Sequence, residues 1–176
     1  EVIYNNQNAI FKVCFQEVEK VDSIEDWESL DAIIECCLQF VLKMNDNMFK
    51  SVFVKFIELE PKHPNAFYRF SNRLLLELKE LFVPYFGQVM DAAIRILKSS
   101  KEEDRLDGLV ENVINCFKSM FTFGYNNLET TVPICELLLT KFVSWFYGES
   151  SFSLMTETIC VIQKASDADN QKKINQ

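Results

Sequence analysis

Glycine and proline are scarce in this chain, with 4 of each among its 176 residues. Both residue types interrupt regular structure and build turns, so their scarcity argues against a strand-rich fold with many tight turns. Large apolar residues are abundant instead: apolar types make up 48% of the chain, and phenylalanine alone occurs 16 times. The composition therefore favours long helices around a well-filled core.

Positive charge is also in short supply. Lys and Arg total 18 against 26 Asp and Glu, which gives a formal net charge of −8. Binding to a phosphate backbone depends on clustered Lys and Arg. The charge balance therefore argues against a domain whose main task is to grip nucleic acid, but it leaves open a nucleoprotein assembly in which this domain touches protein only.

Metal-binding patterns are missing as well. The six cysteines form no Cys-x-x-Cys pair, and His63 is the only histidine, so a zinc site of mixed Cys and His ligands is not expected. The adjacent Cys36 and Cys37 point to different sides of a helix. We expect reduced thiols packed as small hydrophobes in an intracellular protein, with no metal and no cofactor.

The sequence holds no catalytic constellation. Nucleophilic chemistry with a histidine base would depend on His63, which lies between two prolines in a link. The four glycines are too far apart to form a phosphate loop. The acidic groups Glu58/Glu60 and 102–104 are typical of solvated faces or of a helix N-terminus. We therefore predict that the protein is not an enzyme and has no small-molecule substrate.

Long apolar runs and a secretion signal are absent from the sequence. No run reaches the ~20 residues that span a bilayer, and the first residues lack a basic lead-in and an apolar core. The chain does not start with Met. We expect no membrane contact and a fragment of a much longer protein.

Helical periodicity predicts eight helices and the start of a ninth. Ser23 is the expected N-cap of the second helix, Asp46 of the third, and Asp167 of the short last one. Thr131 and Pro133 are expected to open the seventh, and Gly148 to end it. The expected ranges are 2–20, 23–42, 46–60, 65–82, 84–97, 102–121, 131–147, 152–165 and 167–176.

The segment 65–86 is the most informative part of the chain. One helix face is expected to carry apolar side chains spaced by three and four, namely Phe67, Phe70, Leu74, Leu78 and Leu81. Leu75 and Leu76 fall off that face, so this helix is apolar on two sides. Such helices are usually sandwiched between neighbours.

Short links between helices predict antiparallel helical hairpins. Pairs of ~40–47 residues would match HEAT repeats. We therefore predict an all-α fold: an α-solenoid-like, HEAT-like stack of antiparallel helix pairs, forming a single helical-repeat domain over residues 1–176. The aromatic run at 117–125 is expected to be core or helix-end packing rather than a stacking platform for bases.

One polar strip is a candidate contact surface. Arg69 and Arg73 lie one turn apart, and Leu76 and Glu80 are expected near the same side. The strip suits a partner helix or a stretch of RNA backbone. The alternative is that both arginines form ordinary ion pairs, with Glu77 or with acids on a neighbouring helix.

Several segments, in order and spacing, resemble the conserved C-terminal domain family of the very large nucleolar HEAT-repeat proteins that associate with U3 small nucleolar RNA in the small-subunit processome. The first segment, 40–53, holds the end of a helix, a polar turn and a Phe-rich start of the next helix. The second, 65–86, holds an aromatic pair, a Leu-Lys pair and a later Tyr-Phe pair. The other two are the helix at 109–117 and the Lys-x-x-Asn element at 172–175. The resemblance covers most of the chain from about residue 30.

This resemblance implies a non-catalytic scaffold at or near the C-terminal end of its parent protein. The implied role is ribosome biogenesis, in pre-rRNA transcription and processing, through other processome subunits. U3 snoRNA and pre-rRNA would belong to the same ribonucleoprotein, and the location would be the nucleolus within the nucleus. Two alternatives remain: an unrelated α-solenoid adaptor in transport or signalling, and a small helical enzyme or ligand carrier with a phenylalanine-lined cavity.

Overall fold

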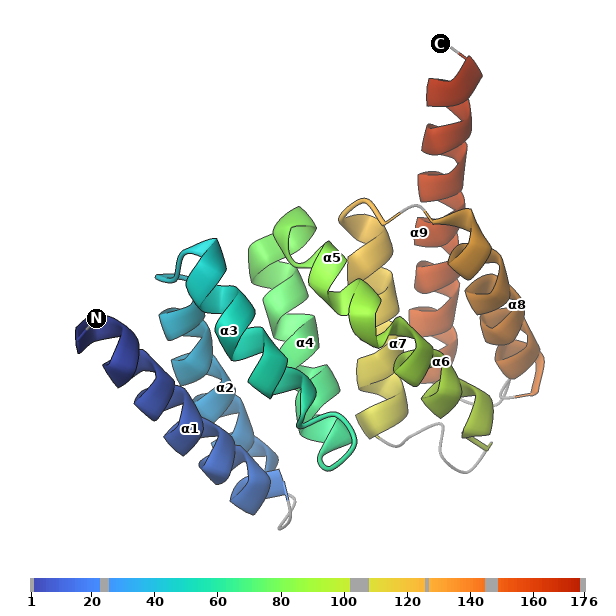
Figure 1. Ribbon diagram of the computed structural model, residues 1–176. Coiled ribbons are helices and arrows are strands. Elements are labelled where there is room, and N and C mark those ends of the chain that lie inside the picture. Colours follow the sequence, from blue (N-terminus) through green and yellow to red (C-terminus); the bar gives the residue numbers. More distant parts are fainter. Residues whose placement is uncertain (1, 23–25, 102–107, 126, 145–148, 175–176) are drawn as a thin grey trace. The chain divides into compact units, whose positions relative to one another are not determined.

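The computed structural model describes residues 2–22, 26–101, 108–125, 127–144 and 149–174. Within these ranges the chain forms nine α-helices and two short 3-10 helices, and no β-strand (Figure 1). The prediction of an all-α fold of stacked helices is confirmed. The bounds are α1 Val2–Asp22, α2 Trp27–Val41, α3 Asp46–Ile57, α4 Pro64–Leu78, η1 Lys79–Leu81, α5 Val83–Phe86, η2 Gly87–Val89, α6 Met90–Ser99, α7 Gly108–Thr122, α8 Leu128–Ser144 and α9 Glu149–Ile174.

The helices cluster into two compact units, Glu1–Leu74 (unit 1) and Leu75–Gln176 (unit 2). The boundary falls inside α4, which spans Pro64–Leu78. The single domain expected over residues 1–176 stays a prediction, and the two units are described in turn.

Unit 1 contains α1, α2, α3 and most of α4, and successive helices alternate in direction (Figure 1). Helix α1 packs against both α2 and α3. Phe56 of α3 is the centre of the core. Its ring stacks on Phe67 at a centroid distance of 4.6 Å, meets Phe70 edge-on at 5.0 Å, and lies 6.2 Å from Phe15.

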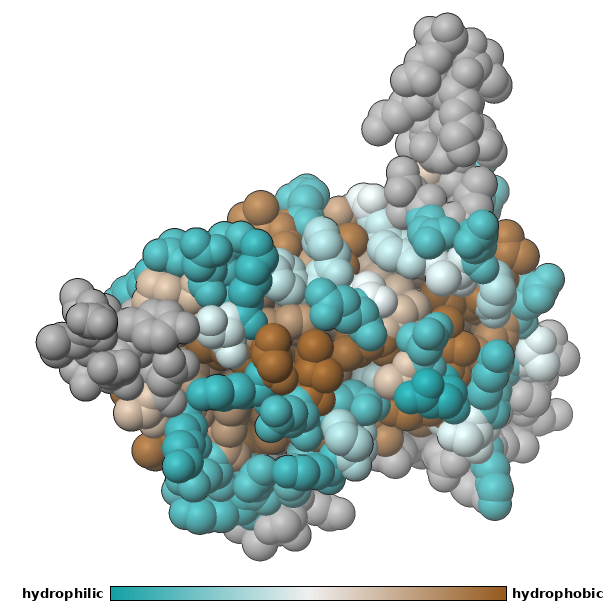
Figure 2. Space-filling model, in the orientation of Figure 1, coloured by the Kyte–Doolittle hydropathy of each residue, from teal (hydrophilic) through white to brown (hydrophobic). Residues whose placement is uncertain are grey.

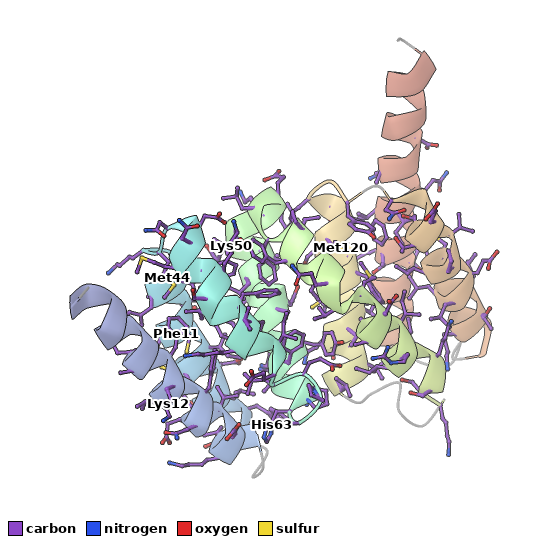
Figure 3. All side chains as sticks on the ribbon, viewed as in Figure 1. Phe11, Lys12, Met44, Lys50, His63 and Met120 are labelled. Carbon is purple, nitrogen blue, oxygen red and sulfur yellow. The ribbon has the colours of Figure 1, made fainter. Side chains whose placement is uncertain are left out.

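The apolar side of α1 is only partly buried. Phe11, Phe15 and Val18 are buried, whereas Ile10 and Cys14 are intermediate. In Figure 3 Phe11 belongs to the core side of α1, and the neighbouring Lys12 is exposed.

Unit 2 contains two helical hairpins, α6–α7 and α8–α9, preceded by the short helices η1, α5 and η2. Helix α7 packs against α9, and α6 packs against α8. The core of unit 2 is apolar: Val113 and Met120 of α7 and Leu138 of α8 are fully buried. Helices α6 and α8 thus form one layer of unit 2, and α7 and α9 form the other.

Helix starts in unit 1 differ from the prediction by one to a few residues. Helix α2 is capped by Asp26, whose side chain accepts a hydrogen bond from the Ser29 N–H at 3.1 Å. Helix α3 is capped by Asn45, which accepts from the Met48 N–H at 3.0 Å. A cap accepts from the N–H two or three positions on. Because Asn45 fills that role, Asp46 becomes the first residue of the helix, and Ser23 lies outside the described residues.

The fourth helix was expected to reach about Phe82, and this is wrong. Lys79 has φ 51°, a left-handed conformation that is uncommon for a residue other than glycine. The α-helix therefore ends at Leu78 and a 3-10 turn follows. The break shifts the face register: Leu81, expected to be buried, is 75% exposed, while Phe82 is fully buried.

The later helices were predicted with the wrong bounds. The expected fifth helix is divided into α5, η2 and α6. The expected seventh starts earlier, at Leu128, so Pro133 lies inside it. The two helices expected at 152–165 and 167–176 are one continuous helix, α9. Gly148, the expected end of the seventh helix, lies outside the described residues. Gly124, at φ +94°, follows the end of α7.

Candidate interaction surface

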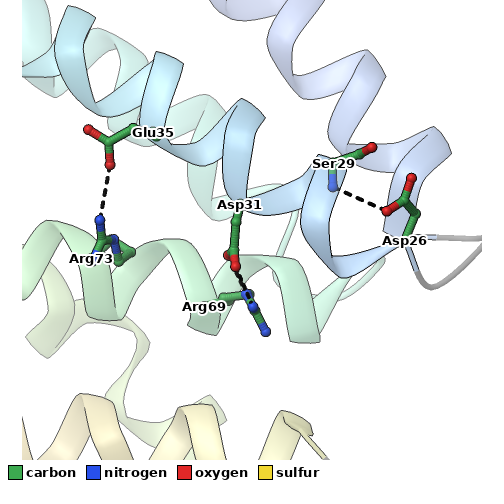
Figure 4. A network of polar contacts seen from close by, with 6 residues as sticks. All are labelled: Asp26, Ser29, Asp31, Glu35, Arg69 and Arg73. Carbon is green, nitrogen blue, oxygen red and sulfur yellow. Dashed lines mark hydrogen bonds and ion pairs between the residues drawn. The ribbon is translucent and has the colours of Figure 1, made fainter.

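Arg69 and Arg73 lie on α4 within unit 1, and both reach toward α2 (Figure 4). The helix that carries them begins at Pro64, where proline is well tolerated because its missing N–H would have no helical partner. Its inward positions Phe67, Phe70 and Leu74 are buried as predicted. Arg69 and Arg73 lie on a different side of α4, within reach of α2.

Arg69 makes the better-formed ion pair. Its Nε and one terminal nitrogen donate to the two carboxylate oxygens of Asp31, each at 2.6 Å. The guanidinium also lies 5.9 Å from the ring centroid of Trp27, within the range of a cation–π contact. The hydrogen bonds from Arg69 lower the pKa of the Asp31 carboxyl below its usual value. A two-pronged pair is more specific in geometry than a single contact.

Arg73 makes the second contact, one helical turn further along. One of its terminal nitrogens donates to a Glu35 carboxylate oxygen at 3.0 Å. Gln39 donates to the other carboxylate oxygen of Glu35 at 2.9 Å. These two donors, Gln39 first, lower the pKa of Glu35. Both members of the pair are about half exposed, with side-chain exposures of 48% and 47%, so the pair adds little stability on its own.

The two ion pairs show the relative direction of α2 and α4. Both join residues that are 38 positions apart in sequence, and both step forward by four residues on each helix. Only parallel helices in constant register keep such an offset from one turn to the next. The ring contact between Phe15 and Phe56 relates α1 to α3 by a similar spacing of 41 residues. Unit 1 is therefore two helical hairpins stacked side by side, in the arrangement of HEAT-like repeats.

The ion pairs that were the alternative interpretation are present, with acids on the neighbouring helix α2. Sequence reasoning missed the partners Asp31 and Glu35 and the flanking Trp27. One signal pointed to them: an acidic pair four residues apart on one helix matches a basic pair four residues apart on another. The choice of α2 was not readable, because nothing local specifies which helix lies beside α4.

The other two members of the strip belong to unit 2. Leu76 lies in the last turn of α4 and is 42% exposed. Glu80 is exposed and lies in η1, after the helix has broken at Lys79. The helical spacing that was expected to align Glu80 with the arginines is therefore interrupted. The contact strip of Arg69, Arg73, Leu76 and Glu80 stays a prediction.

Hydrophobic side chains also reach the surface. Figure 2 shows brown, hydrophobic residues between teal, hydrophilic ones on the face in view. The most exposed large hydrophobics of unit 1 are Val54 of α3 and Val13 of α1. In unit 2 they include Val132 and Leu139, both on α8. Single exposed apolar residues of this kind are normal on protein surfaces.

The aromatic run near the end of α7 belongs to the packing of unit 2, as predicted. Phe117 and Phe121 are buried. The ring of Tyr125 meets Phe121 edge-on at 5.6 Å, and its hydroxyl forms a hydrogen bond with Thr130 at 2.5 Å. These three rings pack within their own unit.

Of the two acids noted at the end of the third helix, Glu58 is exposed, and Glu60 accepts a hydrogen bond from the buried Tyr68 hydroxyl at 3.2 Å. Among the residues that the structure describes, no group of three or more His, Cys, Asp or Glu could hold a metal ion. None of the described helices has the length and apolarity to cross a membrane.

The fold and the surface define a class: all-α proteins built from helical hairpins that stack with a nearly constant offset. The chain belongs to the BP28CT (NUC211) domain family, whose sequence model matches residues 4–128, more than half of the chain. The resemblance seen in the sequence is thereby confirmed. The matched residues include both ion pairs between α2 and α4.

Several curated relatives carry one name, "U3 small nucleolar RNA-associated protein 10". The protein from Yarrowia lipolytica is 25% identical over 98% of this chain, the one from Candida albicans 30% identical over 38%, and the one from Meyerozyma guilliermondii 21% identical over 80%. The chain spans only 11%, 4% and 9% of the length of these relatives. No solved structure matches it.

Proposed function

We propose that this chain is a non-catalytic scaffold segment of a small-subunit processome component, acting in pre-rRNA transcription and processing and in small ribosomal subunit biogenesis. The observation that carries the proposal is the similarity to a U3 small nucleolar RNA-associated protein over 98% of the chain. The same similarity favours this function over an unrelated adaptor in transport or signalling. The expected location is the nucleolus.

The stacked hairpins support a scaffold role physically. Helices held in constant register present parallel ridges of side chains to solvent, and such surfaces bind extended partners without any catalytic group. The net charge of −8 favours contact with protein subunits over contact with an RNA backbone. U3 snoRNA and pre-rRNA would therefore belong to the same assembly, with proteins bound to this segment.

Purification of the full-length parent protein from cells, followed by sequencing of its bound RNA, tests the proposal. We expect U3 snoRNA and pre-rRNA to be enriched over a tagged control protein. An RNA population without either species would rule out the assignment to the processome.

The contact strip needs variants that separate binding from folding, because Arg69 also holds Asp31. Arg69→Ala and Asp31→Asn both remove the ion pair, but only the first removes the arginine. If Arg69 contacts a partner, co-purification of processome proteins with the full-length parent falls for Arg69→Ala and is retained for Asp31→Asn. Equal losses for the two variants would mean that the arginine serves only the fold.

The apolar member of the strip has a matched control in the same unit. Leu76 and Val132 are similarly exposed, at 42% and 52%, so an aspartate at either position would keep contact with water. We expect Leu76→Asp to reduce co-purification and Val132→Asp to leave it unchanged. Retention of partners by both variants would remove Leu76 from the contact surface.

A further inference from the structure

Two adjacent serines end helix α6 in unit 2, and an acidic run follows them in the sequence. Ser99 is the last residue of the helix, and Ser100 is its C-cap, with extended backbone at φ −63° and ψ 138°. Residues 102–104 are Glu, Glu and Asp. Each serine therefore has an acidic residue three positions further along the chain.

We propose that Ser99 is a phosphorylation site for a serine kinase that recognises acidic residues after its target, here called an acid-directed kinase. Kinases distinguish their substrates by charge pattern, and a basic cleft attracts carboxylates that lie close to the serine. The co-reactant is ATP with Mg²⁺. The proposal does not depend on the scaffold function, because it rests on this segment alone.

Exposure separates the two serines. Ser99 is exposed, whereas Ser100 is only 8% exposed. The Ser100 hydroxyl donates a hydrogen bond to the Ile96 carbonyl at 2.7 Å, and the Ser100 N–H donates to the same carbonyl at 3.0 Å. A kinase must reach the hydroxyl oxygen of its target. Ser99 is therefore the target, and Ser100 is the matched control.

Modification of Ser99 leaves the backbone at the helix end satisfied. The Ser99 hydroxyl donates to the Ile96 carbonyl at 3.0 Å, and phosphorylation removes that hydrogen. The carbonyl keeps both hydrogen bonds from Ser100, so it does not become an unsatisfied acceptor. Helix ends also fray more readily than helix centres, so Ser99 can enter a kinase cleft without unfolding the rest of α6.

A cation already lies beside this serine. The Lys141 ammonium of α8 donates to the carbonyl of Lys98 at 3.3 Å and to the carbonyl of Ser100, which are the two neighbours of Ser99. Phosphoserine carries a charge of about −2 at pH 7, and the C-terminal end of a helix repels negative charge. Lys141 offsets that repulsion, so the modified helix end stays compatible with the fold.

The reaction balances with ATP as the phosphoryl donor. The Ser99 hydroxyl oxygen attacks the γ-phosphorus, the bond from this phosphorus to the oxygen of the β-phosphate breaks, and ADP leaves. The hydroxyl proton passes to a carboxylate base of the kinase. The product is a phosphate ester on Ser99.

The experiment incubates the complete 176-residue chain with a purified acid-directed kinase and Mg-ATP. Chymotrypsin then cuts after Leu97 and Leu106, and the peptide 98–106 contains Ser99 and Ser100 as its only hydroxyl residues. Mass spectrometry should find one phosphate on this peptide from the parent chain and from Ser100→Ala, and none from Ser99→Ala. A phosphate that persists in Ser99→Ala, or an unmodified peptide from the parent chain, would overturn the proposal.

The acidic run has a separate test that keeps the target serine. Glu102→Gln combined with Glu103→Gln should slow the modification by about tenfold, the size of effect expected when close charge pairs with the kinase are lost. Circular dichroism checks that each variant is folded. A kinase directed by basic residues is the comparison, because Arg95 and Lys98 precede Ser99. An unchanged rate in the Gln variant, or faster modification by the second kinase, would contradict recognition through the carboxylates.

Discussion

The core of unit 1 brings aromatic rings from different helices together, whereas the buried residues described in unit 2 mix aliphatic, methionine and phenylalanine side chains. In unit 1, Phe56 of α3 touches rings from α1 and α4. In unit 2, the rings of Phe82 and Tyr85 and those of Phe121 and Tyr125 pair within short stretches of sequence. The buried residues of unit 2 include Leu138 of α8 and Ile162 of α9.

The spacing between stacked helices is nevertheless similar in both units. In unit 1 the ion pairs between α2 and α4 join residues 38 positions apart. In unit 2 the ion pair of Lys118 with Glu157 spans 39, and the bond from the Lys141 ammonium to the Ser100 carbonyl spans 41. Different side chains therefore maintain one offset. Helix lengths and short links set the register, and the side chains at the contacts stabilise it.

The largest expected effects come from the aromatic core of unit 1. Phe70→Ala and Phe53→Ala should each lower the free energy of unfolding by roughly 3–5 kcal/mol, because both rings are buried and their removal leaves a cavity. Phe56→Ala should lie at the upper end of that range, since Phe56 packs against rings from both α1 and α4. Chemical denaturation measures the effect, and a change within error would mean that these side chains are exposed.

The helix cap in unit 1 has a smaller expected effect. Asn45→Ala should cost about 1 kcal/mol, because the Met48 N–H loses its acceptor. Asp46→Ala should cost less, since the ion pair of Asp46 with Lys50 at 2.5 Å is exposed and exposed pairs contribute little. Thermal melts of the two variants check the order. A larger loss for Asp46→Ala would restore the capping role expected from the sequence.

Acid should weaken unit 1 through its paired carboxylates. The pKa values of Asp31 and Glu35 are lowered in the folded chain by hydrogen bonds, from Arg69 to Asp31 and from Gln39 and Arg73 to Glu35. A lowered folded pKa stabilises the native state above the unfolded value of about 4, and this contribution is lost as pH falls through the folded pKa. Stability should therefore be level near neutral pH and fall below about pH 4.

The Asp31→Asn variant isolates that effect. It removes one titrating carboxyl, so its stability should fall less steeply with acid than that of the parent chain. In unit 2, Glu157 has a lowered pKa for the same reason, chiefly through Lys118. Circular dichroism melts from about pH 2 to 7, roughly the range over which carboxylates titrate, would show the loss of stability in acid and its reduction in Asp31→Asn. A fall that is identical with and without Asp31 would contradict this origin.

The smallest expected effect concerns the coupling of the α2–α4 contacts. A double-mutant cycle on Arg69 and Asp31 should give a coupling energy of about 0.2–1 kcal/mol, the range of partly exposed pairs. The cycle on Arg73 and Glu35 should give less, because a single hydrogen bond joins that pair. Coupling that is larger for Arg73 would show that the two-pronged geometry of Arg69 does not hold in solution.

The sequence was informative where periodicity and composition decide the structure. Helical spacing identified the buried face of α4 at Phe67, Phe70 and Leu74. It failed at Leu81, because a left-handed Lys79 has no sequence signal as clear as a glycine. It also divided α9 in two, since the polar residues around Asp167 are typical of a cap as well as of an exposed helix face.

Of the contacts between α2 and α4, the sequence predicted only the residues on α4. Arg69 and Arg73 were recognised as a pair, and ion pairing with acids on another helix was one of the two interpretations. That Asp31 and Glu35 supply those acids depends on a contact across 38 residues of chain. Local sequence carries no information on such distances until the order and packing of the helices are known.

The most direct test of the scaffold function removes this segment from the full-length parent protein and measures the parent that co-purifies with U3 snoRNA. We expect the deletion to cause a marked loss of association with U3 snoRNA. The full-length parent with Val132→Asp, a substitution at an exposed position outside the strip, should keep this association. Unchanged recovery of the truncated parent with U3 snoRNA would contradict the claim that these stacked helices hold the protein in the processome.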